Sequence, residues 1–463
     1  MFLLLFLGII NLFKLWLVRF LPLLGDEAYY NLWSRYPALS YTDHPPMIAW
    51  IHGLIGQNEF GVRLGAIITL LIATWLIYQI GKEAFGKKIG AASAVIFNLV
   101  PTYFVGGLFL TPEQPLIIFW LLAIYFTIQI IKTGESKNWY LLGISIGLGL
   151  LSKYPMVLFI PGLFLFIVLS EKHRSWLKRK EPYLAIVLAS LIASPVLIWN
   201  IQNNFPALAH HGARLGNPNY LSNVLYFFVL QFLMYSPPLF IFSCSTFFFE
   251  FWKRFKQFDD YSLFLIASSL AAFIPFLFVS PFTLVGGHWT STVYLGIIVL
   301  LCHKFLTAFP KPFKTSRFWF NMTIIILINV LFVSYYAFIY PIPEGLTYKT
   351  NSELPAFIKT VDADYVFSNQ MGVGSLVAFY GKTDAYLPSG YWKQFDIWGH
   401  PEVKKGESVL YFVFGDPEME KKLKKVFWQV KEDKTKRLMI KDSDIPVKTR
   451  IYICKYFKGG RLP

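Results

Sequence analysis

The chain has 463 residues, of which 55% are hydrophobic, 19% aromatic and only 15% charged. Soluble domains carry about 25% charged residues, so this composition excludes an ordinary soluble protein and indicates an integral membrane protein. The net charge of +16 would suggest nucleic-acid binding in a soluble chain. Here the basic residues occupy short loops between apolar runs, a pattern typical of a membrane orientation signal. We therefore expect no nucleic-acid partner.

Apolar runs of membrane-spanning length recur along residues 1–341. A span needs about 20 apolar residues, or fewer when it is buried among other helices. The sequence predicts eleven spans, at 2–24, 62–80, 89–108, 115–131, 139–151, 155–170, 183–200, 222–247, 261–281, 290–308 and 319–340. The fifth and sixth divide one long apolar stretch at Ser152-Lys153-Tyr154-Pro155, because proline cannot continue a helix but can begin one.

Basic residues are distributed unequally between the two sets of loops. Alternate loops from Gly81 onward carry 17 lysines and arginines, whereas the opposite loops carry Arg35, Lys153 and Arg214, with Arg63 on the border. By the positive-inside rule, the basic set is cytoplasmic. The other set then places a group of ionisable residues on the outer side: Asp26, Glu27, Asp43, His44, Glu113, Lys153, Arg214 and His288.

The first outer loop, residues 25–61, contains two motifs rich in such groups. Gly25-Asp26-Glu27-Ala28-Tyr29-Tyr30 opens an amphipathic stretch to Tyr36 that is typical of a helix lying in the membrane interface. Asp26 fits a helix N-cap and a catalytic carboxylate equally well when taken alone. The adjacent Glu27, in a loop at the edge of a hydrocarbon phase, favours catalysis by this pair.

The second motif, Asp43-His44-Pro45-Pro46, precedes a helix predicted over residues 47–55. The free N–H groups at the start of that helix, beside the His44 imidazole, suit a phosphate oxyanion. An ordinary proline-initiated helix with a solvated histidine is the other interpretation, and spacing alone favours it.

Further candidates lie in the later outer loops. Glu113 and Lys153 carry opposite charges at similar depth and predict a structural ion pair, with contact of Lys153 to a donor phosphate as the second interpretation. The guanidinium group of Arg214 matches phosphate geometry. Its neighbours His210 and His211 are ligand types that could bind a metal together with Asp43, but adjacent residues rarely converge on one ion, so a partly solvated loop is the favoured interpretation.

A divalent metal is a candidate cofactor. Asp43 supplies a carboxylate and His288, at the start of the tenth span, supplies an imidazole that could reach the same cavity. Both are ligand types that divalent metals accept.

The composition changes from about Ile342. Residues 344–463 are richly charged, with strand-like runs at 408–414 and 450–454 and a Lys/Glu-rich helical stretch at 417–430. This pattern predicts a small α/β domain over 342–463, large enough for its own core. Eleven spans with an inner amino terminus place it outside the cytoplasm.

Residues 26–30, 43–50 and 59–64 resemble the opening of the bacterial family 39 glycosyltransferases, the relatives of the protein O-mannosyltransferases and of the lipid A aminoarabinose transferase. The resemblance continues through 110–116, 147–154 and 194–200, and more weakly at 394–398. It implies a GT-C fold, in which this chain is a polytopic α-helical membrane protein with a small extracytoplasmic α/β domain. It also implies a polyprenyl-phosphate sugar donor and an acceptor on the outer face.

The resemblance assigns roles to three residues. It implies that Asp26 is the general base and that Asp43 and His44 contact the donor phosphate or a metal. Two departures separate this chain from the aminoarabinose branch, which has arginine at the position of Tyr29 and lysine at the position of His44. The resemblance therefore does not imply the same donor sugar.

These observations favour a glycosyltransferase of the bacterial inner membrane that moves a sugar, with inversion, to lipid A or lipopolysaccharide, a protein or another glycan. Its partners would be the donor lipid, that acceptor and the membrane lipids. The alternative is a transporter or flippase of an anionic polyprenyl-linked lipid, although such a route needs polar groups near the membrane midplane. A mere anchor for the tail domain would need no clustered outer charges.

Overall fold

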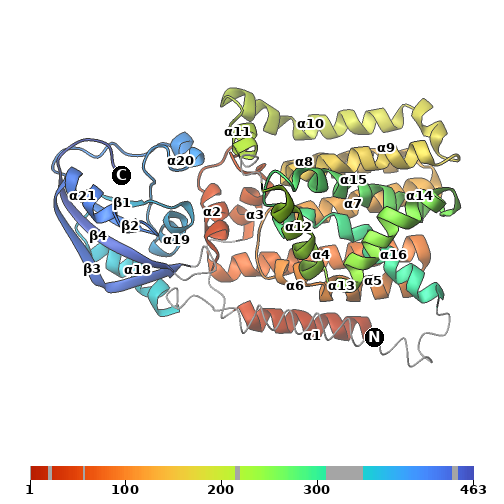
Figure 1. The fold of residues 1–463 in the computed structure, drawn as a ribbon, viewed down its shortest axis with the longest axis horizontal. Helices are drawn as coiled ribbons and strands as arrows, with labels where there is room; N and C mark the ends of the chain where they lie inside the picture. Colours follow the sequence, from red (N-terminus) through yellow and green to blue (C-terminus); the bar gives the residue numbers. More distant parts are fainter. Residues whose placement is uncertain (1, 19–22, 56–57, 214–218, 309–347, 441–446) are drawn as a thin grey trace. The chain divides into compact units, whose positions relative to one another are not determined.

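The computed structural model describes residues 2–18, 23–55, 58–213, 219–308, 348–440 and 447–463 (Figure 1). The chain forms two compact units. The helical unit comprises Met1–Leu15, Ala38–Ile48 and Arg63–Ala337, and the mixed unit comprises Trp16–Pro37, Ala49–Val62 and Phe338–Pro463. Residues 25–61, the predicted first outer loop, are thus divided between the two units. The predicted domain boundary at 341/342 lies outside the described residues and stays a prediction.

The helical unit consists of helices at the positions of the first ten predicted spans. The helices and the two short 3-10 turns used below are α1 (Phe2–Leu17), α4 (Glu59–Phe85), α5 (Lys87–Leu99), α6 (Pro101–Gly106), α7 (Glu113–Thr133), α8 (Ser136–Ser152), η2 (Tyr154–Leu158), α9 (Phe159–Leu169), α10 (Glu181–Gln202), α11 (Pro206–Ala213), α12 (Tyr220–Met234), α13 (Pro237–Ser245), α14 (Phe251–Arg254), α15 (Asp260–Val279), η7 (Gly287–Thr290) and α16 (Val293–Ala308). The eleventh predicted span, 319–340, lies outside the described residues.

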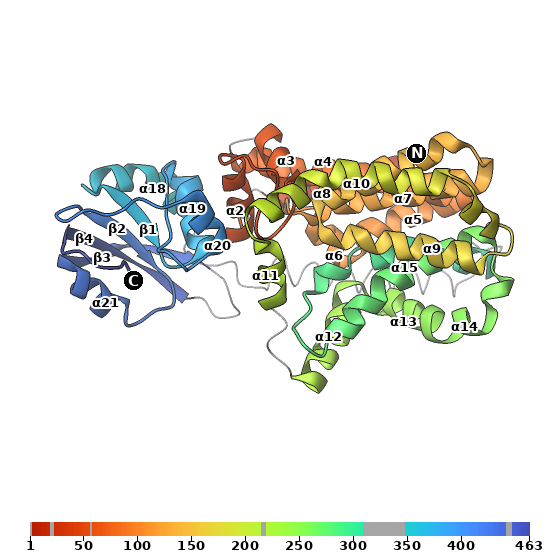
Figure 2. The ribbon, with the colours of Figure 1, turned by 90° about the horizontal axis from the view of Figure 1, so that it is seen from above.

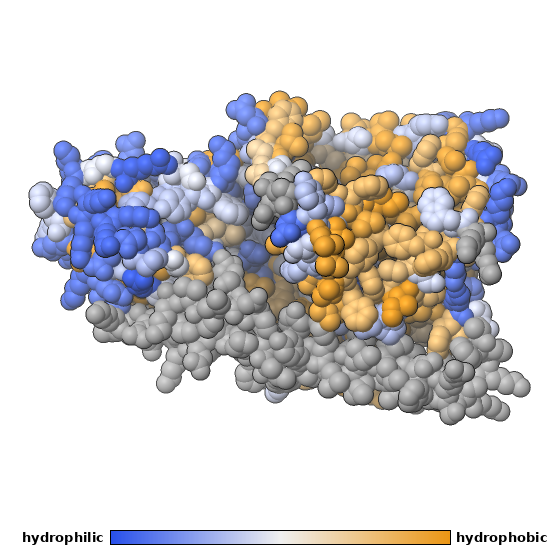
Figure 3. Space-filling view, in the orientation of Figure 1, coloured by the Kyte–Doolittle hydropathy of each residue, from blue (hydrophilic) through white to orange (hydrophobic). Residues whose placement is uncertain are grey.

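Among the described helices, α4, α7, α10 and α15 are long and apolar enough to cross a membrane. Together with the composition, they make the chain a multi-pass membrane protein, while the count of eleven spans stays a prediction. Figure 3 shows apolar side chains gathered over the helical unit, and hydrophilic ones over the sheet of the mixed unit.

Small residues allow the long helices to approach closely. Helix α8 packs against both α7 and α10 (Figure 2). A Cβ atom added at Gly143 would lie 2.6 Å from the carbonyl oxygen of Ala185, and one at Gly147 would lie 2.7 Å from Cβ of Ile192. Glycine at these positions permits close backbone packing, the usual device of membrane helices.

The long apolar stretch of residues 139–170 is interrupted where the sequence predicts. Helix α8 ends at Ser152, and Lys153 is extended with φ −161° and ψ 141°. The η2 turn then begins at Tyr154, followed by α9. Lys153 is therefore presented from a break between helices.

The mixed unit combines helices with one sheet. Its elements are α2 (Gly25–Trp33), most of α3 (Met47–Ile55), α18 (Tyr348–Thr360), β1 (Tyr365–Ser368), α19 (Met371–Gly381), α20 (Lys393–Trp398), β2 (Val409–Val413), α21 (Met419–Val426), β3 (Phe427–Ile440) and β4 (Val447–Phe457). The strand order is β1-β2-β4-β3, with β1 parallel to β2 and the other pairs antiparallel.

The buried face of this sheet forms a core with α21. The side chains include Tyr411 and Tyr452 from the sheet and Met419 and Leu423 from the helix. Helix α21 ends at Val426, earlier than the predicted 430, because Phe427 begins β3 and pairs with Phe457 of β4. An independent extracytoplasmic domain over 342–463 stays a prediction.

Candidate active site

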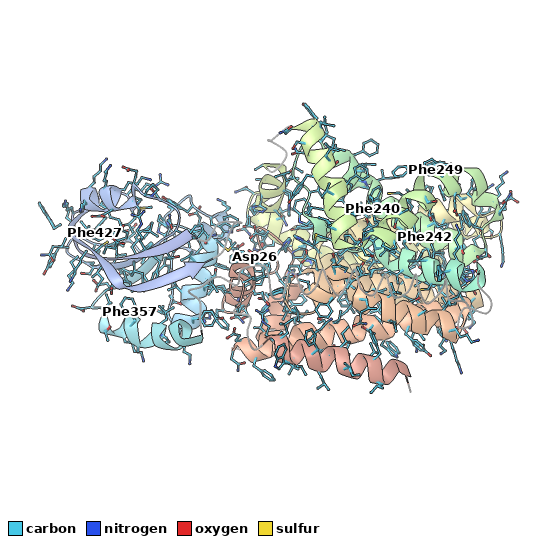
Figure 4. The ribbon with its side chains drawn as sticks, turned by 60° about the horizontal axis from the view of Figure 1, so that its bottom comes forward. Asp26, Phe240, Phe242, Phe249, Phe357 and Phe427 are labelled. Carbon is cyan, nitrogen blue, oxygen red and sulfur yellow. The ribbon has the colours of Figure 1, made fainter. Side chains whose placement is uncertain are left out.

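Helix α2 presents the two adjacent carboxylates in different environments. Glu27 is fully buried, and its Oε2 accepts a hydrogen bond from the Leu24 N–H at 3.0 Å. Asp26 is the second residue of the helix and is exposed on the mixed unit (Figure 4). Its negative charge is favoured there by the positive end of the helix dipole. Asp26 is therefore the exposed carboxylate of the two, whereas Glu27 closes the first turn of the helix.

The aromatic face of α2 is buried in protein. Tyr29, Leu32 and Trp33 are all buried within the mixed unit. The expectation of a helix lying in the membrane interface is therefore wrong for this face, because α19 and α20 supply partners that the local pattern could not reveal.

In the helical unit, Asp43 is buried between two adjacent histidines of α11. His210 Nε2 lies 3.0 Å from Asp43 Oδ1, and His211 Nε2 lies 3.1 Å from the backbone carbonyl oxygen of Asp43. The expected solvated loop is instead a helix that turns both imidazoles toward one residue. The adjacent histidines were visible in the sequence. Their contact with Asp43 was not, because His211 and Asp43 are 168 residues apart in the chain.

A second polar group is centred on Glu113 at the first position of α7. Lys153 Nζ forms an ion pair and hydrogen bond with Glu113 Oε1. His288 Nε2, from η7, lies 3.4 Å from the same oxygen. The other carboxylate oxygen accepts a hydrogen bond from Thr111 Oγ1 at 2.8 Å. The Glu113 and Lys153 side chains are only 12% and 8% exposed, so this pair is held in a largely water-free setting.

The buried His44 side chain interacts electrostatically with both groups, through Asp43 in the first and through Glu113 and Lys153 in the second. Burial, followed by the Lys153 charge, lowers the pKa of His44 to about 3, although Glu113 and Asp43 act in the opposite direction. The imidazole is therefore neutral at physiological pH. It can donate one hydrogen bond to an anion, while the positive charge of the group comes from Lys153.

The helical unit thus brings together five of the residues singled out from the sequence: Asp43, His44, Glu113, Lys153 and His288. Asp26 and Glu27 belong to the mixed unit. Arg214 lies outside the described residues, so its contact with a donor phosphate stays a prediction.

A divalent metal would need several ligands that converge on one point. Asp43 is placed against His210 and His288 against Glu113, so the two predicted ligands have different partners. Within the described ranges, no group of three or more His, Cys, Asp or Glu residues is arranged to hold a metal ion. Among the described residues, these side chains therefore do not form a complete metal-binding set.

The fold is that of the GT-C glycosyltransferases. ArnT from Cupriavidus metallidurans, in its crystal structure with bound undecaprenyl phosphate, superposes with a TM-score of 0.68. The match covers 97% of this chain and 98% of that chain at 13% sequence identity.

The resemblance of the chain to family 39 is confirmed at the level of sequence. The family described as dolichyl-phosphate-mannose-protein mannosyltransferase matches residues 43–199. The lipid A galacturonosyltransferase RgtD of Rhizobium johnstonii is 24% identical over 305 residues, which are 63% of this chain and 62% of that protein.

A second relative is the undecaprenyl phosphate-alpha-4-amino-4-deoxy-L-arabinose arabinosyl transferase of Erwinia tasmaniensis. It is 27% identical over 189 residues, which are 37% of this chain and 33% of the relative. The chain therefore covers less than two thirds of the length of either curated relative.

Proposed function

We propose that the chain is a membrane glycosyltransferase that transfers a sugar from a polyprenyl-phosphate donor to a hydroxyl group of lipid A or lipopolysaccharide on the outer face of the inner membrane. The observation that carries the proposal is the buried Glu113–Lys153 ion pair beside His44, within a GT-C fold. The names of the two relatives support the donor and acceptor classes.

The donor phosphate would bind at Lys153 and His44. The lysine supplies a positive charge in a setting of low dielectric constant, where charge stabilisation is strong. The neutral imidazole supplies an N–H donor without a second charge. Glu113 holds the lysine in place, and the apolar helices around this group suit a polyprenyl chain.

Asp26 would act as the general base. It accepts the proton of the acceptor hydroxyl while the oxygen forms a bond to the anomeric carbon. The bond from that carbon to the phosphate oxygen breaks at the same time, and its electron pair leaves with the polyprenyl phosphate. Attack opposite the leaving phosphate inverts the anomeric carbon.

The first experiment replaces the base. Asp26→Asn keeps the shape of the side chain but cannot accept the proton, so we expect sugar transfer to fall about 10²-fold or more while undecaprenyl phosphate still raises the melting temperature. Mass spectrometry of envelope glycolipids, from cells that lack the gene and carry each variant, measures the transfer.

The matched control is Asp362→Asn, at an exposed aspartate of the mixed unit, which should transfer sugar as the wild type does. Full transfer by the Asp26 variant would contradict the assignment of the base. A wild-type chain that alters no envelope glycolipid would contradict the glycosyltransferase proposal and favour a lipid transporter.

A further inference from the structure

Aromatic residues around α20 contact the helix that carries Asp26. Tyr29 follows Asp26 by one helical turn and is 1% exposed. Its hydroxyl group accepts a hydrogen bond from Trp392 Nε1 at 2.9 Å. Its ring is stacked on Phe395, with 6.1 Å between the centroids and 11° between the planes. Two residues from the C-terminal part of the chain therefore fix one side chain of α2.

A third aromatic residue holds the end of the same segment. Trp398 is stacked on Tyr36, just after α2, with 4.8 Å between the ring centroids and 22° between the planes. Its ring also lies 6.2 Å from that of Tyr29. We call Trp392, Phe395 and Trp398 the aromatic cluster.

The first turn of α2 packs directly on α19. A Cβ atom at Gly25 would lie 2.9 Å from Cα of Gly372, so the two backbones touch at this point. The N–H of Leu23 donates a hydrogen bond to the hydroxyl group of Tyr380 at 3.0 Å. Asp26 is the residue that follows this contact.

These contacts matter because α2 is short. A helix of nine residues is marginal on its own, so its direction is set by what it packs against. A general base must lie within hydrogen-bond reach of the proton that it accepts, and a displacement of about 1 Å can cost about 10²-fold in rate.

We propose that the C-terminal part of the chain serves as a positioning element for catalysis, in which the aromatic cluster and Gly372 orient α2 and so aim Asp26. The proposal rests on the function proposed above. Trp392, Phe395, Trp398 and Gly372 are positioning residues, since they act through α2. The candidate phosphate-binding residues lie in the helical unit, so disturbing α2 should affect transfer without affecting phosphate binding.

The test uses the full-length chain with four variants. Gly25→Ala forces α2 away from α19, and Gly53→Ala is its matched control, because a Cβ atom there would meet only Ser34 Cβ at an ordinary 3.6 Å. Trp398→Ala removes the stacking partner of Tyr36, and Trp398→Phe keeps an aromatic ring. Glycolipid mass spectrometry measures transfer, and the rise in melting temperature with undecaprenyl phosphate measures binding of the phosphate.

We expect sugar transfer by Gly25→Ala and by Trp398→Ala to fall about tenfold or more. The rise in melting temperature with undecaprenyl phosphate should stay as in the wild type. Trp398→Phe should recover part of the transfer, and Gly53→Ala should match the wild type. Wild-type transfer by both disruptive variants would overturn the positioning role alone. Parallel loss of transfer and of the phosphate response would also overturn it, in favour of a general role in folding. An inactive wild type would instead overturn the proposed function.

Discussion

Glu113 interacts with both Lys153 and His44. Lys153 supplies a positive charge there, whereas the His44 imidazole is neutral. A buried ion pair contributes little net stability, but removing one partner leaves an uncompensated charge. This asymmetry explains how a single lysine can be both a structural partner of Glu113 and the cation for a donor phosphate. The phosphate would share the lysine with the carboxylate rather than replace it.

Replacing Lys153 tests both roles. Lys153→Met keeps a long side chain but leaves Glu113 buried without its cation, so we expect a loss of about 3–5 kcal/mol in unfolding free energy. The melting-temperature response to undecaprenyl phosphate should be lost as well. Thermal unfolding in detergent, with and without that lipid, measures both effects.

The control is Lys132→Met, which breaks the more exposed Lys132–Glu83 pair and should cost less than about 1 kcal/mol. Equal stability of the two variants would show that the Glu113–Lys153 pair is not buried as described. A normal lipid response in Lys153→Met would remove Lys153 from the phosphate site.

At the scale of elements, the η7 turn that carries His288 is held by a buried hydrogen-bond network. Gln231 Oε1, from α12, accepts hydrogen bonds from Thr290 Oγ1 at 2.6 Å and from the Tyr294 hydroxyl at 3.1 Å. The Tyr235 hydroxyl donates to the carbonyl oxygen of Gly287 at 2.9 Å. These bonds hold the Gly287 carbonyl group and the Thr290 side chain, which flank His288 in the turn.

Removing the shared acceptor should therefore loosen η7. In Gln231→Leu, the Tyr294 hydroxyl loses its acceptor, whereas the Thr290 hydroxyl still has the Gly287 carbonyl oxygen at 3.0 Å. A buried hydroxyl group left without an acceptor costs about 1–3 kcal/mol. We expect lower thermal stability and reduced sugar transfer, because His288 is no longer held against Glu113. Unfolding curves and glycolipid mass spectrometry measure the two effects. Tyr294→Phe, which removes only one donor, should show a smaller change, and equal effects of both variants would contradict a shared acceptor.

At the scale of the whole molecule, the asymmetry of basic residues predicts which side of the membrane each loop occupies. A cysteine at Glu402, exposed in the mixed unit, should react with a membrane-impermeant maleimide in spheroplasts. A cysteine at Lys137, exposed in the first turn of α8, should react only after the membrane is opened. Two of the native cysteines, Cys302 and Cys454, are buried and should contribute little labelling.

The reverse labelling pattern would place the mixed unit in the cytoplasm. Sugar transfer at the outer face would then be impossible for Asp26, since the base would lie on the wrong side of the membrane.

The sequence by itself determined the class of protein and the residues to examine. Low charge, apolar periodicity and basic loops follow from the chemistry of a chain in lipid, and that chemistry is local. The helix at 47–55, the break at Lys153 and the resemblance to family 39 could all be recognised from short stretches of sequence.

Only the tertiary structure decided how these residues are used. It separated exposed Asp26 from buried Glu27, turned His210 and His211 toward Asp43, and packed the aromatic face of α2 into protein. The partners lie 168 residues apart for His211 and the Asp43 carbonyl group, and 363 residues apart for Trp392 and Tyr29. Hydrophobic periodicity reports the face that a segment buries but not what it is buried against, so these pairings exist only once the chain has folded.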